Sequence, residues 1–333
     1  MSEGSSKQKE DPSPKLSIGG QAVIEGVMMR GPEYIATAVR RKNNQIVIKR
    51  EKFTSITRKK GFFNLPIVRG FISLIEMLII GFKGLNFSAK QAMEDEEAEQ
   101  PPKKKESKAK DTFYEVVTYL FAIGLAFFFF FYLPYQIAYW INISETSVLF
   151  NLFVGIIRVI FFVVYIYLIS LQKDIHRIFE YHGAEHKSVF AYEDDPHFTL
   201  SDTKRYGTHH PRCGTSFIFL VLIIAIVIFS IFDAVVAWIV GHPLSLWLRI
   251  ALHLLLTPFV AGISYEALKL TGKNINHWFV KWLALPGLAL QKITTKQPDE
   301  SQLEVAVCAL RAALNMPVDC ESIEFIDNNG NKK

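Results

Sequence analysis

The chain has 333 residues, half of them hydrophobic and 27 of them phenylalanine, a composition too apolar for an ordinary soluble protein and typical of a membrane protein. The 37 Lys and Arg residues exceed the 32 Asp and Glu residues by only five, which excludes a strongly basic nucleic-acid-binding protein. Three cysteines lie far apart with no apolar signal peptide before them, so we expect reduced thiols and no disulfide framework.

The chain begins with a polar segment rich in Ser, Lys, Glu and Pro, and this composition predicts a disordered tail over residues 1–14. Short apolar runs then alternate with glycine up to Pro32. Two β-rich runs, residues 36–40 and 45–51, lie on either side of a polar turn and predict a hairpin. Residues 15–60 are therefore predicted to form a small β-rich unit.

A helix is predicted next, over residues 66–82, and it is shorter and more polar than a membrane span. Arg69, Ser73, Glu76 and Lys83 recur at spacings that place them in one polar stripe along a helix. Such a helix is expected to lie in the membrane interface. The charged, proline-containing stretch that follows is typical of a linker.

Four later stretches are apolar enough to cross the hydrocarbon core as helices, which takes about 20 residues for about 30 Å. They cover residues 116–140, 147–171, 215–240 and 244–268. We therefore expect a mainly α polytopic membrane protein built on a four-helix transmembrane bundle.

Few charged side chains lie within these spans. Arg158 is near the middle of the second span, where a lone charge costs several kcal/mol. Asp233 on the third span is its predicted partner, with Arg249 on the fourth as a competitor. His253 is predicted to be a histidine satisfied within the bundle.

The distribution of Lys and Arg predicts the orientation. The connections at residues 141–146 and 241–243 have no basic residue, whereas the segment before the first span and the loop at residues 172–214 have many. The positive-inside rule then places this loop and both termini in the cytoplasm.

The C-terminal part contains one further predicted helix. Apolar residues at positions 303, 306, 307, 310 and 314 repeat at helical spacing after Asp299 and Glu300, which suit a helix N-terminus. We therefore divide the chain into a disordered tail (1–14), a cytoplasmic β-rich unit (15–60), an amphipathic interfacial helix (61–92), a charged linker (93–112), spans one and two (113–171), a cytoplasmic loop (172–214), spans three and four (215–270) and a cytoplasmic C-terminal region with a helix (271–333).

The cytoplasmic loop contains the spacing H-x-x-E-H at His182, Glu185 and His186. On a helix, two histidines four residues apart share a face and can bind one metal ion. This is the inverted zincin arrangement, in which the glutamate acts as a general base. The alternative is an exposed polar helix at the membrane surface, where His and Glu are common.

Further candidate ligands lie at the predicted cytoplasmic ends of spans three and four. His210 and Cys213 precede span three, and imidazole and thiolate both suit zinc. Glu266 is the candidate acidic ligand near the end of span four. Their alternatives are a capped helix entry for His210 and Cys213, and a surface carboxylate paired with Lys269 for Glu266. Four protein ligands would make a closed structural site, whereas three would leave a position for catalysis.

Four motifs together resemble the bacterial YqhQ-like family, over roughly residues 15–315: the glycine-rich segment at residues 19–30, the His-Gly-Ala-Glu-His-Lys run at 182–187, His-Pro-Arg-Cys-Gly-Thr at 210–215, and Pro-Gly-Leu at 286–288. This is a family of unknown function whose members are described as multi-span membrane proteins and as predicted metal-dependent enzymes. The resemblance implies a bacterial inner membrane and a metal site at His182, Glu185, His186, His210 and Cys213. It implies no substrate.

The sequence thus predicts an inner-membrane metalloprotein, a metal-dependent hydrolase acting at the inner leaflet on membrane lipid or membrane protein. His182 and His186 are its expected metal ligands, a third comes from His210, Cys213 or Glu266, and Glu185 is the expected catalytic base. The expected cofactor is a divalent metal, zinc above others, and no nucleic-acid partner is expected. A non-enzymatic factor that assists the assembly or stability of other membrane proteins is the alternative, and a transporter is a third hypothesis.

Overall fold

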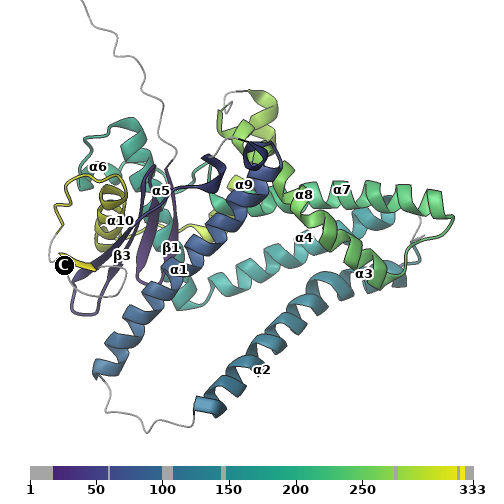
Figure 1. The fold of residues 1–333 in the computed structure, drawn as a ribbon, viewed down its shortest axis with the longest axis horizontal. Helices are drawn as coiled ribbons and strands as arrows, with labels where there is room; N and C mark the ends of the chain where they lie inside the picture. Colours follow the sequence, from purple (N-terminus) through teal and green to yellow (C-terminus); the bar gives the residue numbers. More distant parts are fainter. Residues whose placement is uncertain are drawn as a thin grey trace, which may run out of the picture.

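The structure is a computed structural model that describes residues 18–58, 61–99, 108–143, 148–273, 277–320 and 323–326. The predicted disordered tail, residues 1–14, lies outside the described residues. Figure 1 shows two parts side by side: a sheet with helices packed on it, and long apolar helices that extend away from it. The protein is mostly helical, as predicted.

The β-rich unit is a sheet in the strand order β1-β2-β3-β4-β5. Its first four strands form an antiparallel meander, and the predicted hairpin is confirmed as β3 and β4, with Arg40 paired to Ile46 beside the turn. β5, from the C-terminal region, was not predicted and adds in parallel to β4. The strands are β1 (Gly19–Val23), β2 (Gly26–Arg30), β3 (Tyr34–Arg40), β4 (Ile46–Lys52) and β5 (Ile323–Ile326).

Both faces of the sheet are covered. On β2, Val27 and Met29 point into the core shared with α5 (Lys173–Asp194) and α10 (Glu300–Ala313). Met28 between them points to the other face, where it packs with Ile80 of α1. This alternation is the two-residue period of a strand, and β2 is apolar on both sides because helices cover both sides.

α10 begins at the predicted position. The Asp299 carboxylate accepts a hydrogen bond from the backbone N–H of Gln302 at 2.9 Å, and the Gln302 side-chain oxygen accepts one from the backbone N–H of Asp299 at 2.9 Å. This reciprocal cap contributes about 1 kcal/mol. Leu303 and Leu310 of the helix are buried in the same core as the sheet, and each buried leucine contributes about 1.5–3 kcal/mol.

α1 (Val68–Glu99) is the predicted amphipathic helix, and it is longer than predicted. Residues 93–99, predicted as the start of a linker, are its last turns. Arg41 contacts Asp95 at 2.6 Å and Glu94 at 3.6 Å, which ties this acidic end to the β3–β4 turn. The middle of the polar stripe faces the protein, because Ser73 and Glu76 are both buried, whereas Lys83 at its end is exposed.

The four predicted spans are confirmed as helices long and apolar enough to cross a membrane: Val116–Trp140, Val148–Ser170, Gly214–Val240 and Leu246–Leu270. The first comprises most of α2 (Lys108–Phe127), a π-helical turn (Phe128–Tyr132) and α3 (Leu133–Trp140). The irregular turn ends two residues before Pro134, which has no N–H to continue the α-helical pattern. The other spans are α4 (Val148–Ser170), α7 (Gly214–Val240) and most of α8 (Leu246–Lys273).

One helix of the bundle was not predicted. α9 (Trp278–Thr294) packs against α7, α4 and α8 and brings the chain back from α8 toward the sheet. The remaining helical turns are Ile56–Arg58, Phe62–Asn64 and α6 (Leu200–Thr203).

The predicted pair between Arg158 and Asp233 is wrong. Asp233 accepts a hydrogen bond from His253 Nε2 at 2.9 Å and lies 3.4 Å from Arg249 Nε. Arg249 and His253 are one turn apart on α8, so both reach the same carboxylate. The Arg158 guanidinium instead lies over the Phe131 ring, 5.5 Å from its centroid. His253 is therefore satisfied within the bundle, as predicted.

The expectation of reduced thiols is wrong for two of the three cysteines. Cys308 of α10 and Cys320 form a disulfide, with their Cα atoms 6.3 Å apart. The chain turns at Asn315, which has a φ of 58°, and runs back along α10 toward β5, so residues twelve apart become neighbours. Cys213 is free and buried.

Candidate metal centre

His182 and His186 come from α5, which begins at Lys173 after Gln172 adopts an extended conformation. Four residues separate the two histidines, so they lie one turn apart on the same face, with ring centroids 4.5 Å apart. α5 packs one side on β1 and β2 and another on α10, which holds this face rigidly at the junction with the bundle.

Backbone carbonyls determine which ring nitrogen carries the proton. His182 Nδ1 lies 2.8 Å from the carbonyl oxygen of Thr294, and His186 Nδ1 lies 2.5 Å from that of Thr208. A carbonyl oxygen only accepts, so in both rings Nδ1 is the donor. Nε2 is therefore the unprotonated nitrogen of both rings, the arrangement found in metal-binding histidines.

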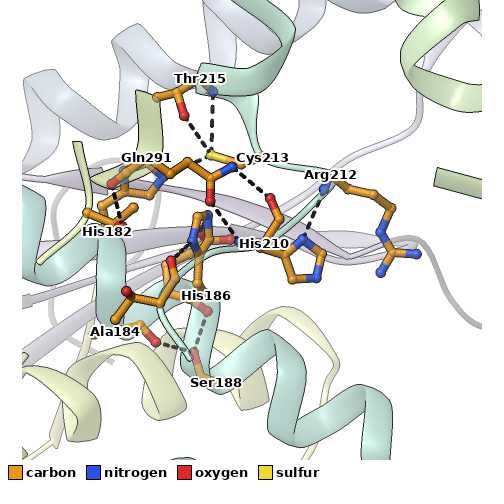
Figure 2. Close-up of polar contacts among 12 residues, drawn as sticks. His182, Ala184, His186, Ser188, His210, Arg212, Cys213, Thr215 and Gln291 are labelled. Atoms are coloured by element: carbon orange, nitrogen blue, oxygen red, sulfur yellow. Dashed lines mark hydrogen bonds and ion pairs between the residues drawn. The ribbon is translucent and has the colours of Figure 1, made fainter. Parts of the chain in front are cut away.

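Cys213 completes the cluster from the start of α7. It is the N-cap residue of that helix, and its sulfur accepts a hydrogen bond from the backbone N–H of Thr215 at 3.4 Å. The sulfur lies 3.1 Å from His182 Nε2, which accepts the thiol hydrogen. Figure 2 shows the thiol and the two imidazoles converging from α5 and α7.

The three donor groups form one compact set. Ligand atoms of His182, His186 and Cys213 all lie within 4.8 Å of one another. His186 Nε2 is buried and has no hydrogen-bond partner. A buried polar atom without a partner is costly in a folded protein, and in this cluster it faces a thiol and a second imidazole lone pair.

Burial adjusts the charge of these histidines. Removal from water lowers the pKa of both His182 and His186 below the ordinary value, because the charged imidazolium is the form that burial disfavours. Both rings are therefore neutral at pH 7. A neutral imidazole is the form that binds a metal.

Glu185 lies beside the cluster and is 4% exposed. One of its carboxylate oxygens is 3.3 Å from His186 Nε2, and burial raises the pKa of this carboxyl. Gly20 of β1 makes room for it, since a Cβ at that position would lie 2.8 Å from Cγ of Glu185 and 2.6 Å from the Met28 carbonyl oxygen. The glycine-rich N-terminal segment thus covers the site.

Two predicted ligands lie outside the cluster. His210 Nδ1 accepts the backbone N–H of Arg212 at 3.2 Å, so its proton is on Nε2, which lies 3.6 Å from Glu193. Figure 2 shows its ring on the side of Arg212. Glu266 forms a bidentate ion pair with Arg69 of α1, at 2.5 and 2.6 Å.

Sequence reasoning missed the part that α9 plays. Thr294 at its end supplies the carbonyl that orients His182. Gln291, fully buried, accepts the backbone N–H of His210 and donates to the His210 carbonyl and to Ser216, each at 2.8 Å. Gly183 allows the chain after α9 to approach, because a Cβ there would lie 1.9 Å from the Lys296 carbonyl oxygen.

Comparison with known proteins agrees with the resemblance seen in the motifs. The family described as protein of unknown function (DUF1385) matches residues 65–316. The chain belongs to this family. It is 32% identical over 326 residues to the uncharacterized protein YqhQ of Bacillus subtilis, and the match covers 93% of this chain and 95% of the relative. No solved structure matches.

The donor set of the DUF1385 chain fits a divalent metal. Two imidazole nitrogens and one thiolate are ligands that zinc prefers, whereas hard cations such as magnesium and calcium bind them poorly. Donors bound tetrahedrally to one zinc ion lie about 2.0–2.3 Å from it, so they are about 3.3–3.8 Å apart. In this structure the three donor atoms lie within 4.8 Å of one another, and His182 Nε2 is 3.1 Å from the Cys213 sulfur.

Proposed function

We propose that this protein is a membrane metalloprotein in which His182, His186 and Cys213 bind one zinc ion. The observation that carries the proposal is the convergence of two imidazole Nε2 atoms and one thiol, all within 4.8 Å of one another; Nε2 of His186 is buried without a hydrogen bond and lies 3.3 Å from the Glu185 carboxyl. The carbonyls of Thr294 and Thr208 support it, because they hold both rings in the tautomer that binds metal.

We further propose that the metal serves hydrolysis of a membrane lipid or membrane protein at the inner leaflet, with Glu185 as the general base. When bound, zinc supplies a Lewis acid that polarises an oxygen of the substrate or of water. Glu185 is the proposed proton acceptor because its carboxyl lies beside the donor atoms, and burial raises the pKa of this carboxyl. Its 3.3 Å distance to His186 Nε2 keeps the carboxylate next to the donor atoms.

Elemental analysis of the purified full chain in detergent tests the metal site. The wild type is expected to contain one zinc per chain, and His182→Ala, His186→Ala and Cys213→Ser are each expected to lose it. His176→Ala is the matched control, because His176 is on the same helix but exposed and contacts Glu180 at 3.5 Å. Wild-type protein without zinc, or zinc retained in a variant that carries all three substitutions, would overturn the site.

A non-enzymatic role is the second candidate, and the position of the cluster favours it. Cys213 caps α7, His182 contacts the end of α9, and α5 packs on the sheet, so a metal here would join the sheet to the bundle. Glu185→Gln separates the two roles. A hydrolase loses turnover of ester or amide substrates in proteoliposomes while it retains zinc and thermal stability; a structural site shows no turnover in either protein.

The proposed location is a bacterial inner membrane with both termini cytoplasmic, and the support is the basic loop at residues 172–214. Lys204→Cys tests it, because Lys204 is exposed in this loop. An impermeant thiol reagent is expected to modify this cysteine only after cells are opened. Modification in intact cells would reverse the orientation.

A further inference from the structure

A cavity remote from the His/Cys cluster lies between α1 and the other face of the sheet. Its volume is about 270 Å³. The apolar wall consists of side chains from β3, the end of β4 and α1, namely Ile35, Phe53, Ile79, Ile80 and Phe87. The volume lies just below the usual 300–1,000 Å³ of ligand pockets, so it suits part of a larger molecule.

Two of the lysines that line this cavity have no carboxylate partner among the described residues. Lys49 pairs with Glu51 at 2.7 Å. Glu76 accepts hydrogen bonds from the Ser55 hydroxyl at 2.6 Å and from the backbone N–H of Ile56 at 2.7 Å. Within the described part of the chain, the remaining charged lining residues, Lys52 and Lys83, are exposed and have no carboxylate partner.

An exposed apolar stripe borders the cavity along α1. It consists of side chains three or four residues apart that are 36–64% exposed, namely Ile75, Leu78, Ile79, Phe82 and Leu85. These spacings place them on one side of the helix, and Ile79 belongs to both the stripe and the cavity wall. A helix with a contiguous exposed apolar side and nearby lysines is typical of a helix that lies in a membrane interface.

We infer that this cavity binds one acidic phospholipid of the membrane on which α1 lies. Lys52 and Lys83 bind the phosphate, and the start of one acyl chain packs on Ile79, Ile80 and Phe87. The rest of the lipid extends past the apolar stripe into the bilayer. This site is separate from the metal site, and it supplies a lipid anchor for the sheet irrespective of the reaction that the protein performs.

The shape and charge of the cavity select this class of ligand. Two lysines with no acidic partner favour an anionic headgroup over a zwitterionic one, since each basic residue near an anionic lipid contributes about 1 kcal/mol. The apolar wall distinguishes a lipid from free phosphate, because free phosphate gains nothing from contact with isoleucine and phenylalanine.

Native mass spectrometry of the detergent-purified full chain tests the inference, with phosphatidylglycerol and phosphatidylcholine as probes. The wild type is expected to retain one phosphatidylglycerol in preference to phosphatidylcholine. Lys52→Gln with Lys83→Gln is expected to weaken phosphatidylglycerol binding by about 30-fold. Lys90→Gln with Lys173→Gln is the matched control, because both lysines are exposed and neither lines the cavity.

A second variant keeps the charge and removes the space. Thr54 is exposed and lines the cavity, so Thr54→Trp is expected to fill it and reduce phosphatidylglycerol binding. Equal binding of the two lipids, unchanged binding by either cavity variant, or full competition by glycerol phosphate would overturn the inference. Zinc content and melting temperature, measured on each variant, show that the fold is intact and keep this test distinct from that of the metal site.

Discussion

Two buried clusters in this protein contain histidine, and they differ in the groups that contact the ring nitrogens. In the bundle, His253 Nε2 donates to the Asp233 carboxylate at 2.9 Å, and Arg249 lies 3.4 Å from the same carboxylate. At the junction of α5 and α7, His182 and His186 donate from Nδ1 to backbone carbonyls, which leaves both Nε2 atoms directed toward each other and the thiol.

This difference separates a structural histidine from a candidate ligand. The Asp233 carboxylate and the Arg249 guanidinium compensate each other's charge within the bundle, so this cluster joins α7 to α8. In the α5–α7 cluster, backbone carbonyls fix the tautomer and leave Nε2 of each ring unprotonated, which is the arrangement on which the proposed zinc site rests. Both clusters are buried and contain histidine, and they differ in the partners of the ring nitrogens.

The largest expected effect is on the bundle cluster. Asp233→Ala leaves Arg249 and His253 without their carboxylate inside the span, and loss of one partner of a buried ion pair costs about 3–5 kcal/mol. We expect a lower melting temperature in detergent and unchanged zinc content in whatever protein remains folded. Loss of zinc with no loss of stability would show that the two clusters are not independent.

A smaller effect is expected where the bundle meets α1. Glu266→Gln removes the bidentate ion pair with Arg69, whose groups are 22% and 25% exposed, and should cost about 1–2 kcal/mol of the free energy of unfolding. Zinc content should not change, because Glu266 is outside the cluster. A Glu266→Gln protein that is stable but free of zinc would restore Glu266 as a ligand.

The pH dependence of the metal-free protein sharpens the comparison further. The pKa values of His182 and His186 are lowered in the folded state, so below the unfolded value of about 6.5 the unfolded chain binds more protons than the native chain. Stability is therefore lost as the pH falls from about 7 toward 5. Unfolding of the chelated protein at several pH values measures this loss, which His182→Gln with His186→Gln should reduce. Burial raises the pKa of Glu185, which acts in the opposite direction, so the difference between the two proteins is the measure: equal pH dependence of the chelated wild type and the double variant would contradict the neutral, buried rings.

The smallest expected effect concerns His210. His210→Ala should leave one zinc per chain, because Nδ1 accepts a backbone hydrogen bond and Nε2 faces Glu193. Elemental analysis beside His186→Ala measures this. Equal loss of zinc in the two variants would place His210 in the coordination sphere and redefine the donor set.

Hydropathy and periodicity predicted much of this fold. Apolar length gave the four spans, β-rich runs gave the β3–β4 hairpin, and the four-residue spacing gave the shared face of His182 and His186. Hydropathy predicts which segments lie in the membrane, and periodicity predicts which residues share one face of a single helix or strand. They do not determine how one helix is rotated toward another, and for this reason Asp233 pairs with Arg249, the predicted competitor, instead of Arg158, and the contact between Glu266 and Arg69 was not predicted.

The groups that orient the two histidines could not be predicted from the type of any single residue. The Thr208 and Thr294 carbonyls that orient the histidines are backbone groups, which every residue type carries. α9 brings Thr294 to the site, and Pro286 interrupts its amphipathic pattern. From the sequence, Pro286 was only part of a family motif, and no helix was predicted there. The Cys308–Cys320 disulfide depends on the turn at Asn315, where a non-glycine residue has a positive φ.

X-ray absorption at the zinc edge of the purified full chain tests the central claim most directly, since it reports the atoms bound to the metal. We expect one sulfur at about 2.3 Å and two imidazole nitrogens at about 2.0–2.1 Å, with the sulfur lost in Cys213→Ser. Zinc with only oxygen neighbours, or a sulfur signal that persists in Cys213→Ser, would contradict the site formed by His182, His186 and Cys213.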